Sequence, residues 1–201
     1  MNKVLFKTAT VVAALFIAFN ASAAVENPFS LYVSKAGEAK KIVLRLDNMF
    51  ADKVTCKIYT ESGAVIFSDE IYTANKTAKK YDLSQLPQGE YTILINDLMK
   101  VEQLDLVVTE NSVDFVNPVA DITFKPTVWV NEDKTVDFNL LSLGNNVNVS
   151  IYNETSEEVY SKSYIGKTTV SKRFNMADLP AGEYTIAVSN GGEIFYNYVT
   201  I

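Results

Sequence analysis

The residues able to do chemistry in this chain are carboxylates and one thiol, because the 201-residue sequence contains no histidine. Its absence excludes Ser-His-Asp and Cys-His nucleophiles, the usual zinc ligand sets and the commonest general base near neutral pH. Catalysis by carboxylates, as in glycosidases, needs two acids that flank a cleft at a fixed separation. The 24 Asp and Glu residues fall mostly at turns and at outward positions such as Asp69-Glu70 and Glu157-Glu158. We therefore expect no enzymatic activity, no catalytic residues and no cofactor.

One oxygen-rich segment, Asn131-Glu132-Asp133 with Asp137 beyond it, carries ligands of the kind that calcium binds. A calcium ion takes six or more oxygens, and a dedicated loop spaces its acidic residues around a glycine. This segment lacks that spacing and that glycine. We expect a polar hairpin turn here and no bound metal.

The elements that must position these residues occur twice along the chain. Leu86 to Ile93 reads LPQGEYTI, and Leu179 to Ile186, 93 positions later, reads LPAGEYTI. Continued without a gap, the same offset aligns apolar with apolar and aromatic with aromatic residues, as a shared core requires: Ile58 with Ile151, Phe67 with Tyr160, Tyr81 with Phe174, and Leu83 with Met176. The two halves are therefore predicted to be copies of one fold.

Within each copy, apolar residues alternate with polar ones, which is typical of half-buried β-strands. In the first copy Val54, Cys56 and Ile58 form one such face. Seven short strands are predicted there, at 29–34, 40–47, 53–60, 64–70, 78–83, 90–96 and 101–108. Such strands, with frequent turns between them, indicate an all-β protein of two tandem antiparallel β-sandwich domains of the immunoglobulin or fibronectin type.

The recurring LPxGEYT motif has a structural interpretation in a sandwich of this type. A tyrosine near the start of the sixth strand turns its hydroxyl back to the upstream backbone at a corner. Tyr91 and Tyr184 occupy that place, so we expect both to be structural corner residues. Cys56 is an inward position whose equivalent is Val149. We therefore interpret Cys56 as a small buried hydrophobe, in preference to a reactive thiol or an intermolecular cross-link.

Four aromatic residues are candidates for surface binding, two in each copy. We predict that they pair on the outer face of one hairpin if the strand register suits: Tyr59 with Phe67, and Tyr152 with Tyr160. Rigid aromatic faces bind sugars and protein partners well. The alternative, which we favour, is a cross-strand pair that stabilises its own hairpin by about 0.2–1 kcal/mol.

The first residues have the features of a secretory signal peptide, predicted at 1–23. Lys3 and Lys7 precede an uncharged stretch from Thr8 to Phe19, and Ala21-Ser22-Ala23 supplies the small residues of a cleavage site. About 12 apolar residues are too few to span a membrane, which takes roughly 20. We expect an exported protein in the periplasm, at the cell surface or outside the cell, with no transmembrane segment in the mature chain.

The overall charge and the repeat complete the predicted organisation. A formal net charge of −6 makes nucleic acid an unexpected partner, because phosphate backbones are bound by clustered Lys and Arg. The first sandwich is predicted at 24–109, a linker at 110–117 and the second sandwich at 118–201. So short a linker favours modules stacked end to end with limited bending.

Two long stretches carry a family resemblance. YDLSQLPQGEYTILI and FNMADLPAGEYTIAVSNGGEIFYNYVTI resemble the C-terminal sorting domains of cargo exported by the type IX secretion system of Bacteroidota, and related secreted immunoglobulin-like proteins. The resemblance implies a seven-stranded sandwich with a Leu-Pro-x-Gly-x-Tyr strand entry. It also implies recognition by the export machinery, followed in most such proteins by removal of the sorting domain.

The leading hypothesis is an exported, non-enzymatic protein that acts through its surface on a protein partner or a cell-surface component. One alternative is a type IX substrate whose second domain directs export, and another is a carbohydrate-binding accessory protein. Residues 194–201 alternate as a paired strand in a finished sandwich does. We therefore expect the mature protein to keep Ile201.

Overall fold

The computed structural model describes residues 31–35, 37, 39–73, 77–117 and 119–201, so the predicted signal peptide lies outside the described residues. All the regular structure within these ranges is β-strand, and every strand pairing is antiparallel. No helix that could span a membrane occurs in the described part of the chain.

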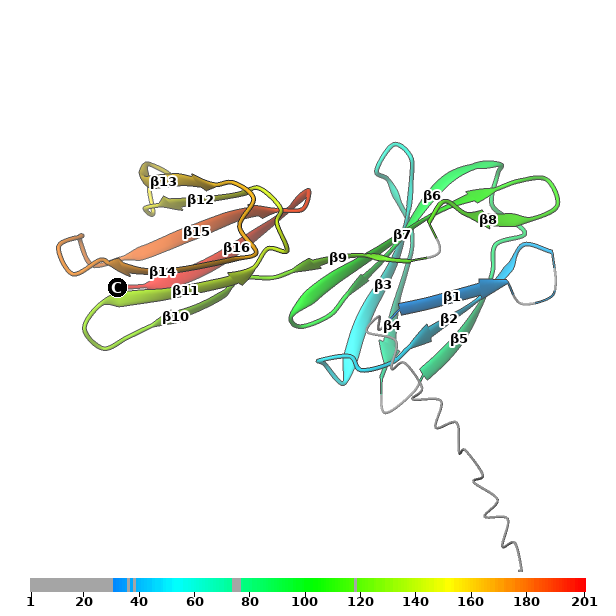
Figure 1. Ribbon diagram of the computed structural model, residues 1–201, viewed down its shortest axis with the longest axis horizontal. Helices are drawn as coiled ribbons and strands as arrows, with labels where there is room; N and C mark the ends of the chain where they lie inside the picture. Colours follow the sequence, from blue (N-terminus) through cyan, green and yellow to red (C-terminus); the bar gives the residue numbers. More distant parts are fainter. Residues whose placement is uncertain (1–30, 36, 38, 74–76, 118) are drawn as a thin grey trace, which may run out of the picture.

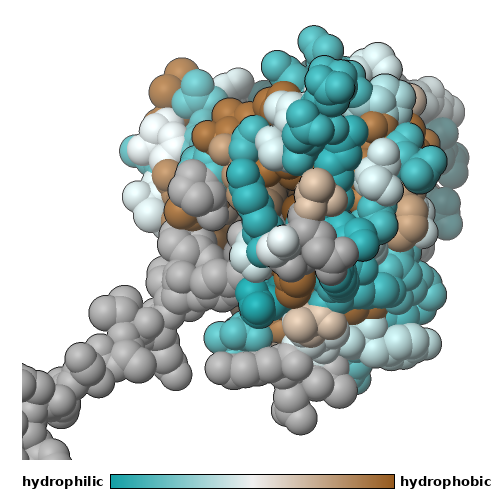
Figure 2. All heavy atoms as spheres, turned by 90° about the vertical axis from the view of Figure 1, so that its right-hand side faces the viewer, coloured by the Kyte–Doolittle hydropathy of each residue, from teal (hydrophilic) through white to brown (hydrophobic). Residues whose placement is uncertain are grey.

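The first sandwich consists of two facing sheets with separate strand orders. One sheet has the order β1-β2-β5, and the other β4-β3-β6-β7-β8, with β9 also paired to β7. The strands are β1 (Leu31–Lys35), β2 (Lys41–Leu46), β3 (Lys53–Thr60), β4 (Val65–Tyr72), β5 (Thr77–Asp82), β6 (Gly89–Asn96), β7 (Lys100–Val108), β8 (Val113–Phe115) and β9 (Asp121–Phe124). Figure 2 shows polar side chains over much of one face of this sandwich, with apolar ones scattered among them.

The second sandwich repeats this plan with fewer strands. Its sheets have the orders β10-β11-β14 and β13-β12-β15-β16. The strands are β10 (Thr127–Val130), β11 (Thr135–Leu141), β12 (Val147–Tyr152), β13 (Glu158–Tyr164), β14 (Thr169–Asn175), β15 (Glu183–Asn190) and β16 (Glu193–Thr200). Figure 1 shows the two sandwiches side by side along the long axis, with β9 leading from one towards the other.

The predicted fold class is confirmed, since the protein is all-β with two tandem immunoglobulin-like sandwiches. The seven strands predicted for the first copy are those observed as β1 to β7, with ends shifted by no more than two residues. Each copy encloses its own hydrophobic cluster, and no buried residue belongs to both clusters.

The structure differs from the predicted organisation in the segment between the copies. Residues 113–115 form β8, which pairs with β7 in the register Leu106 to Phe115, although they fall in the predicted linker. Residues 121–124 form β9, which pairs with the start of β7 although they fall in the predicted second domain. Strands of three and four residues carry too little alternation to be recognised in the sequence. Only Lys125 and Pro126 separate β9 from β10.

The repeat also contains one gap that the sequence comparison missed. From β3 onward the offset of 93 holds, as Ile58 and Ile151 both lie in their cores. In the strand before, however, the fully buried Leu44 corresponds to Phe138, an offset of 94. The loop between β11 and β12 is therefore one residue shorter than its counterpart between β2 and β3. At the ungapped offset of 93, Leu44 would align with Asp137 on the opposite face, because a shift of one residue exchanges the two faces of a strand.

Both tyrosines of the LPxGEYT motif are buried at corners of their sandwiches. The Tyr91 hydroxyl donates to the Pro87 carbonyl oxygen at 3.0 Å, and the Tyr184 hydroxyl donates to the Pro180 carbonyl oxygen at 2.8 Å. Each bond joins the start of the sixth strand to the turn before it, so it holds the entry of β6 or β15 in place.

Replacing either corner tyrosine by phenylalanine removes this hydroxyl bond and keeps the ring. We expect Tyr91→Phe and Tyr184→Phe each to lower the free energy of unfolding by about 0.5–1.5 kcal/mol, because a proline carbonyl loses its buried donor. Denaturant melts of the two single variants measure this loss. Unchanged midpoints in both would show that these bonds contribute nothing to stability.

Candidate functional site

The structure does not bring the predicted aromatic pair of the first copy together. In the β3–β4 hairpin Phe67 lies opposite Ile58, and a register shift separates it from Tyr59. Directly opposite residues share a face, so Phe67 lies on the inner side with the buried Ile58. Its ring packs edge-on against Tyr81 with the centroids 5.5 Å apart, whereas Tyr59 lies on the outer face.

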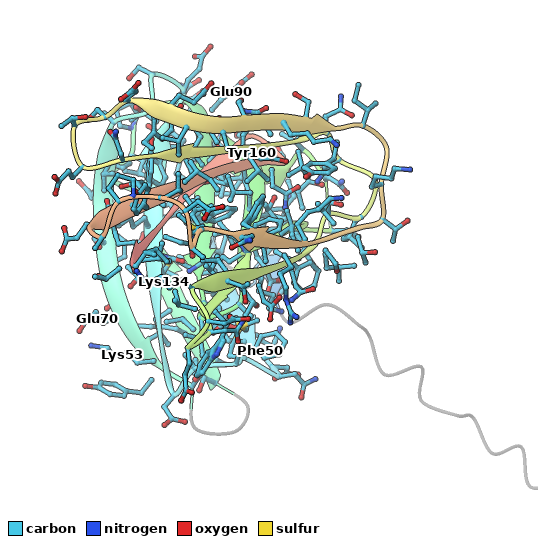
Figure 3. All side chains as sticks on the ribbon, turned by 90° about the vertical axis from the view of Figure 1, so that its left-hand side faces the viewer. Phe50, Lys53, Glu70, Glu90, Lys134 and Tyr160 are labelled. Carbon is cyan, nitrogen blue, oxygen red and sulfur yellow. The ribbon has the colours of Figure 1, made fainter. Side chains whose placement is uncertain are left out.

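The second copy has the same arrangement. Tyr160 lies opposite the buried Ile151, and the same register shift separates it from Tyr152. Its ring packs against Phe174 at 5.1 Å between centroids, and its hydroxyl lies 3.2 Å from that of Tyr164 (Figure 3). Tyr160 therefore packs against the second core, Phe67 lies on the inner side of its hairpin with 39% of its surface exposed, and of the four candidates only Tyr59 and Tyr152 lie on outer faces. The reason is the bulge in each hairpin, which alternation does not reveal.

Cys56 lies inside the first core and has no exposed surface. Burial raises the pKa of its thiol to about 11, although a hydrogen bond with Tyr81 acts in the opposite direction. The Tyr81 hydroxyl in turn donates to Asp69 at 3.0 Å, and Lys79 forms an ion pair with the same carboxylate. A thiol that stays protonated at neutral pH is a poor nucleophile. The environment of Cys56 is thus that of a core residue.

The oxygen-rich segment forms a hairpin turn in which the carboxylates of Asp133 and Asp137 are engaged within the protein. Asp133 accepts bonds from the backbone and hydroxyl of Thr135, and Asn131 donates to Asp137 at 3.0 Å. Arg173 holds Asp137 with two bonds, of 2.6 and 2.7 Å. Among the described residues, no group of His, Cys, Asp and Glu is arranged to hold a metal ion.

The ion pair of Asp137 predicts an acid-sensitive contribution to the second sandwich. The Arg173 guanidinium, assisted by Asn131, lowers the pKa of Asp137 to about 2, whereas an unperturbed aspartate has about 3.9. Because the folded pKa is the lower one, the contribution is complete above about pH 4 and is lost as the pH falls through about 2. We expect Asp137→Asn to lose less stability than the unaltered protein between about pH 5 and about pH 2, measured by urea unfolding. Equal losses would contradict this assignment.

A surface that the sequence did not single out lies on the outer face of the second sandwich. Three tyrosines and an isoleucine surround a groove of about 630 Å³ over β12, β15 and β16, whose floor consists of small residues such as Ser150 and Ala187. We call this surface the tyrosine groove: Tyr152, Ile194, Tyr196 and Tyr198. Tyr198 is its most open member, with 78% of its surface exposed.

The described residues of the first copy form no such groove at the corresponding positions. Ile194, Tyr196 and Tyr198 correspond to Val101, Gln103 and Asp105 of β7. The exposed fraction falls from 57% at Ile194 to 6% at Val101, because β9 lies beside that part of β7. Alternation alone makes the two final strands look equivalent. Only the pairing of β8 and β9 with β7 shows that one is inside a sheet and the other at its edge.

The connection between the sandwiches is held by bonds from both sides. The Asn190 side-chain amide, which is fully buried, donates to the Phe124 carbonyl oxygen at 3.0 Å. Lys125 donates from its backbone to Met99 at 2.9 Å and from its ammonium to the Asp97 carbonyl oxygen at 2.6 Å. Gly191 packs so closely that a Cβ there would lie 2.6 Å from the Thr123 hydroxyl.

The family model of the secretion system C-terminal sorting domain matches residues 38–109 and again residues 130–200. The chain belongs to this family. The two matched ranges contain β2 to β7 in the first sandwich and β11 to β16 in the second. Family membership implies export out of the cell. No curated relative matches the sequence.

Several solved structures are similar to the chain at low identity. A segment of two fibronectin type III domains from chicken tenascin is 13% identical, with 85% of this chain and 97% of that one covered and a TM-score of 0.32. The BSP domain of a biofilm associated protein is 15% identical, with a TM-score of 0.30. The match covers 86% of this chain but only 29% of that protein.

Proposed function

We propose that the protein is exported through a type IX secretion system and acts outside the cell as a non-enzymatic pair of β-sandwich modules. The second sandwich serves in this proposal as the export determinant. The observation that carries it is the family match over residues 130–200, which includes the strands β11 to β16 of that sandwich.

The two copies match the same family, but they differ in how their final strand is placed. β7 lies between β6 on one side and β8 and β9 on the other, so its backbone is enclosed in the sheet. Among the described strands, β15 is the one that pairs with β16. A receptor that reads the final strand would reach it only in the second copy. This difference supports the second sandwich as the one that the export machinery recognises.

The bonded connection supports a mature protein that keeps both sandwiches. A protease that detached the second sandwich would have to cut in or near the segment 110–126. Residues 113–115 and 121–124 of this segment are paired with β7, and Lys125 is bonded to Met99 and Asp97. Exposed, unpaired loops are the preferred sites of cleavage, and in this segment they are confined to the turn at Glu110-Asn111 and to the stretch that begins at Val116.

A reporter fusion tests the export role. We expect a secreted reporter placed ahead of residues 125–201 to reach the cell exterior, whereas the same reporter ahead of residues 31–124 stays inside the envelope. Tyr184→Phe in the fusion serves as a control for a mild loss of stability. Retention of both fusions, or export of the first-copy fusion alone, would contradict the proposal.

A second candidate function, binding of a glycan, is favoured by the tyrosine groove. Its exposed tyrosines line the same groove as the polar side chains of Asn148 and Ser150, and sugars are bound by a combination of ring stacking and hydrogen bonding. It predicts retention on an insoluble polysaccharide that Tyr196→Ala with Tyr198→Ala abolishes and that Tyr59→Ala leaves intact. A lack of retention of the unaltered protein would remove this candidate.

A further inference from the structure

The backbone of β16 is bonded on one side and open on the other. Gly182 and Ile201 exchange two backbone hydrogen bonds, of 3.2 and 3.0 Å, just beyond the β15–β16 ladder. Every second pair of an antiparallel ladder is bonded in this way, so the odd-numbered residues of β16 bond to β15. The even-numbered residues turn their N–H and C=O groups to the opposite side, where no described strand lies: Ile194, Tyr196, Tyr198 and Thr200.

The first copy shows what such an edge accepts. There the Asp105 carbonyl oxygen, which corresponds to that of Tyr198, accepts a bond from the Val116 amide at 3.0 Å. Antiparallel strands β8 and β9 extend this pairing along β7. The same fold thus completes its sheet with an added antiparallel strand when one is within reach.

β16 also lacks the features that prevent an edge strand from pairing with a strand of another molecule. Lysine, proline, inward charges and bulges on edge strands prevent pairing with other chains. The other edge strands carry charged residues, apart from the four-residue β10, and the β13 edge also has a bulge beside it. β16 is eight residues long, pairs without a register shift and has one charge, Glu193, at its start.

We propose that β16 pairs with β16 of a second copy of this chain, antiparallel about a two-fold axis through Asn197. In this register Tyr196 lies opposite Tyr198 of the second copy, and Ile194 opposite Thr200. All the open backbone groups of the four even-numbered residues are then used, with about eight hydrogen bonds in all. Glu193 faces Ile201 of the second copy, so no like charges meet.

Asn197 favours this register over its neighbours. It replaces the buried Leu104 of the first copy, and its Nδ2 atom is buried with no hydrogen-bond partner among the described residues. A buried amide of this kind is costly unless it finds a partner. On the two-fold axis each Asn197 stands opposite the other in a non-hydrogen-bonded pair, where side chains come closest. Each amide can then donate to the carbonyl oxygen of the other, as single buried asparagines do where they set the register of coiled coils.

The same pairing also brings aromatic side chains together on the outer face of the sheet. The two pairs of tyrosines become cross-strand neighbours on one continuous sheet, and the two tyrosine grooves join across the axis. Aromatic cross-strand pairs stabilise sheets. The dimer would cover the β16 edge that the proposed export receptor reaches, so in this proposal pairing follows export. The two proposals are tested separately, because self-association is measured on the purified protein and export in cells.

The molecular mass in solution of the mature protein, purified in the form that the host exports, tests the proposed pairing. Sedimentation equilibrium between about 1 μM and 1 mM is expected to show a reversible dimer. Tyr198→Pro removes an edge amide that β15 does not use, so the sandwich stays folded and self-association weakens about tenfold or more. Tyr198→Phe keeps the amide and the dimer. A monomer throughout this range, or a Tyr198→Pro protein that dimerises equally well, would overturn the proposal.

A cysteine scan tests the register even if the proline variant fails to fold. Asn197→Cys places two thiols directly opposite each other on the axis, where we expect a disulfide-linked dimer to form in air and to account for most of the protein. Residue 200 is more exposed, but in this register it lies far from residue 200 of the second copy. We therefore expect little cross-linking of Thr200→Cys. The native Cys56 is buried and does not interfere. Equal cross-linking of the two variants, or none at Asn197→Cys, would rule out this register.

Discussion

Replacement of Phe138 by alanine is expected to lower the free energy of unfolding of the second sandwich by about 3–5 kcal/mol. Phe138 is the largest fully buried side chain of the protein's described part, and it lies at the centre of β11. Its ring packs against Phe174 of β14 with 6.4 Å between centroids. Removing it deletes apolar contacts on both sides and leaves a cavity that the surrounding strands fill only in part.

The matched variant in the first sandwich is Leu44→Ala, because Leu44 occupies the same place in β2 and is equally buried. Its expected cost is about 2–5 kcal/mol. With separate cores, Phe138→Ala shifts the melting of the second sandwich only, and Leu44→Ala that of the first only. Scanning calorimetry of both variants separates the two transitions. A single transition that moves as a whole in both variants would show that the two cores unfold as one unit.

Removal of the Lys100 ammonium is expected to lower the free energy of unfolding of the first sandwich by about 3–5 kcal/mol. The cause is electrostatic and not a loss of packing. Lys100 and Glu102 of β7 form an ion pair of 2.8 Å, with side chains that are 6% and 1% exposed. Lys100→Met takes the positive charge away, so the buried Glu102 carboxylate loses this ion pair. Denaturant unfolding of the first sandwich measures the loss.

Two further variants identify burial as the cause. Lys53 and Glu70 form a pair of almost the same length, 2.9 Å, on the surface of the same sandwich (Figure 3). Lys53→Met is expected to have little effect on the free energy of unfolding, because exposed ion pairs are weak. Replacing Lys100 and Glu102 together by methionine is expected to restore most of the stability. Equal costs for Lys100→Met and Lys53→Met would contradict the role of burial.

Most of the fold follows from alternation and from the repeat. Val54, Cys56 and Ile58 alternate with polar residues over one strand, and their counterparts 93 positions later do the same. This pattern predicts strand, face and copy number together, because a half-buried strand has a period of two. The corner positions of Tyr91 and Tyr184 can also be predicted from the sequence, because the turn and the strand entry occur in one short motif.

The features that could not be predicted from the sequence are those that depend on which strands lie next to each other. Alternation states which residues share a face, but it does not state what lies beside a strand. For this reason β8 and β9 were assigned to the linker and the second domain, Phe67 and Tyr160 were placed on the wrong side of their hairpins, and the tyrosine groove was not recognised. Each of these features is decided by a bulge or by a short strand added at an edge. Neither leaves a periodic signal in so few residues.

The intact mass of the protein exported by its native host tests most directly whether it works outside the cell as a pair of sandwiches. Family membership supports export, and the bonded connection at Lys125 supports retention of both halves. We predict an extracellular or surface-bound species that begins after the predicted signal peptide and still ends at Ile201. A mature species that ends between residues 110 and 126 would contradict the prediction and would make the second sandwich a removable sorting signal.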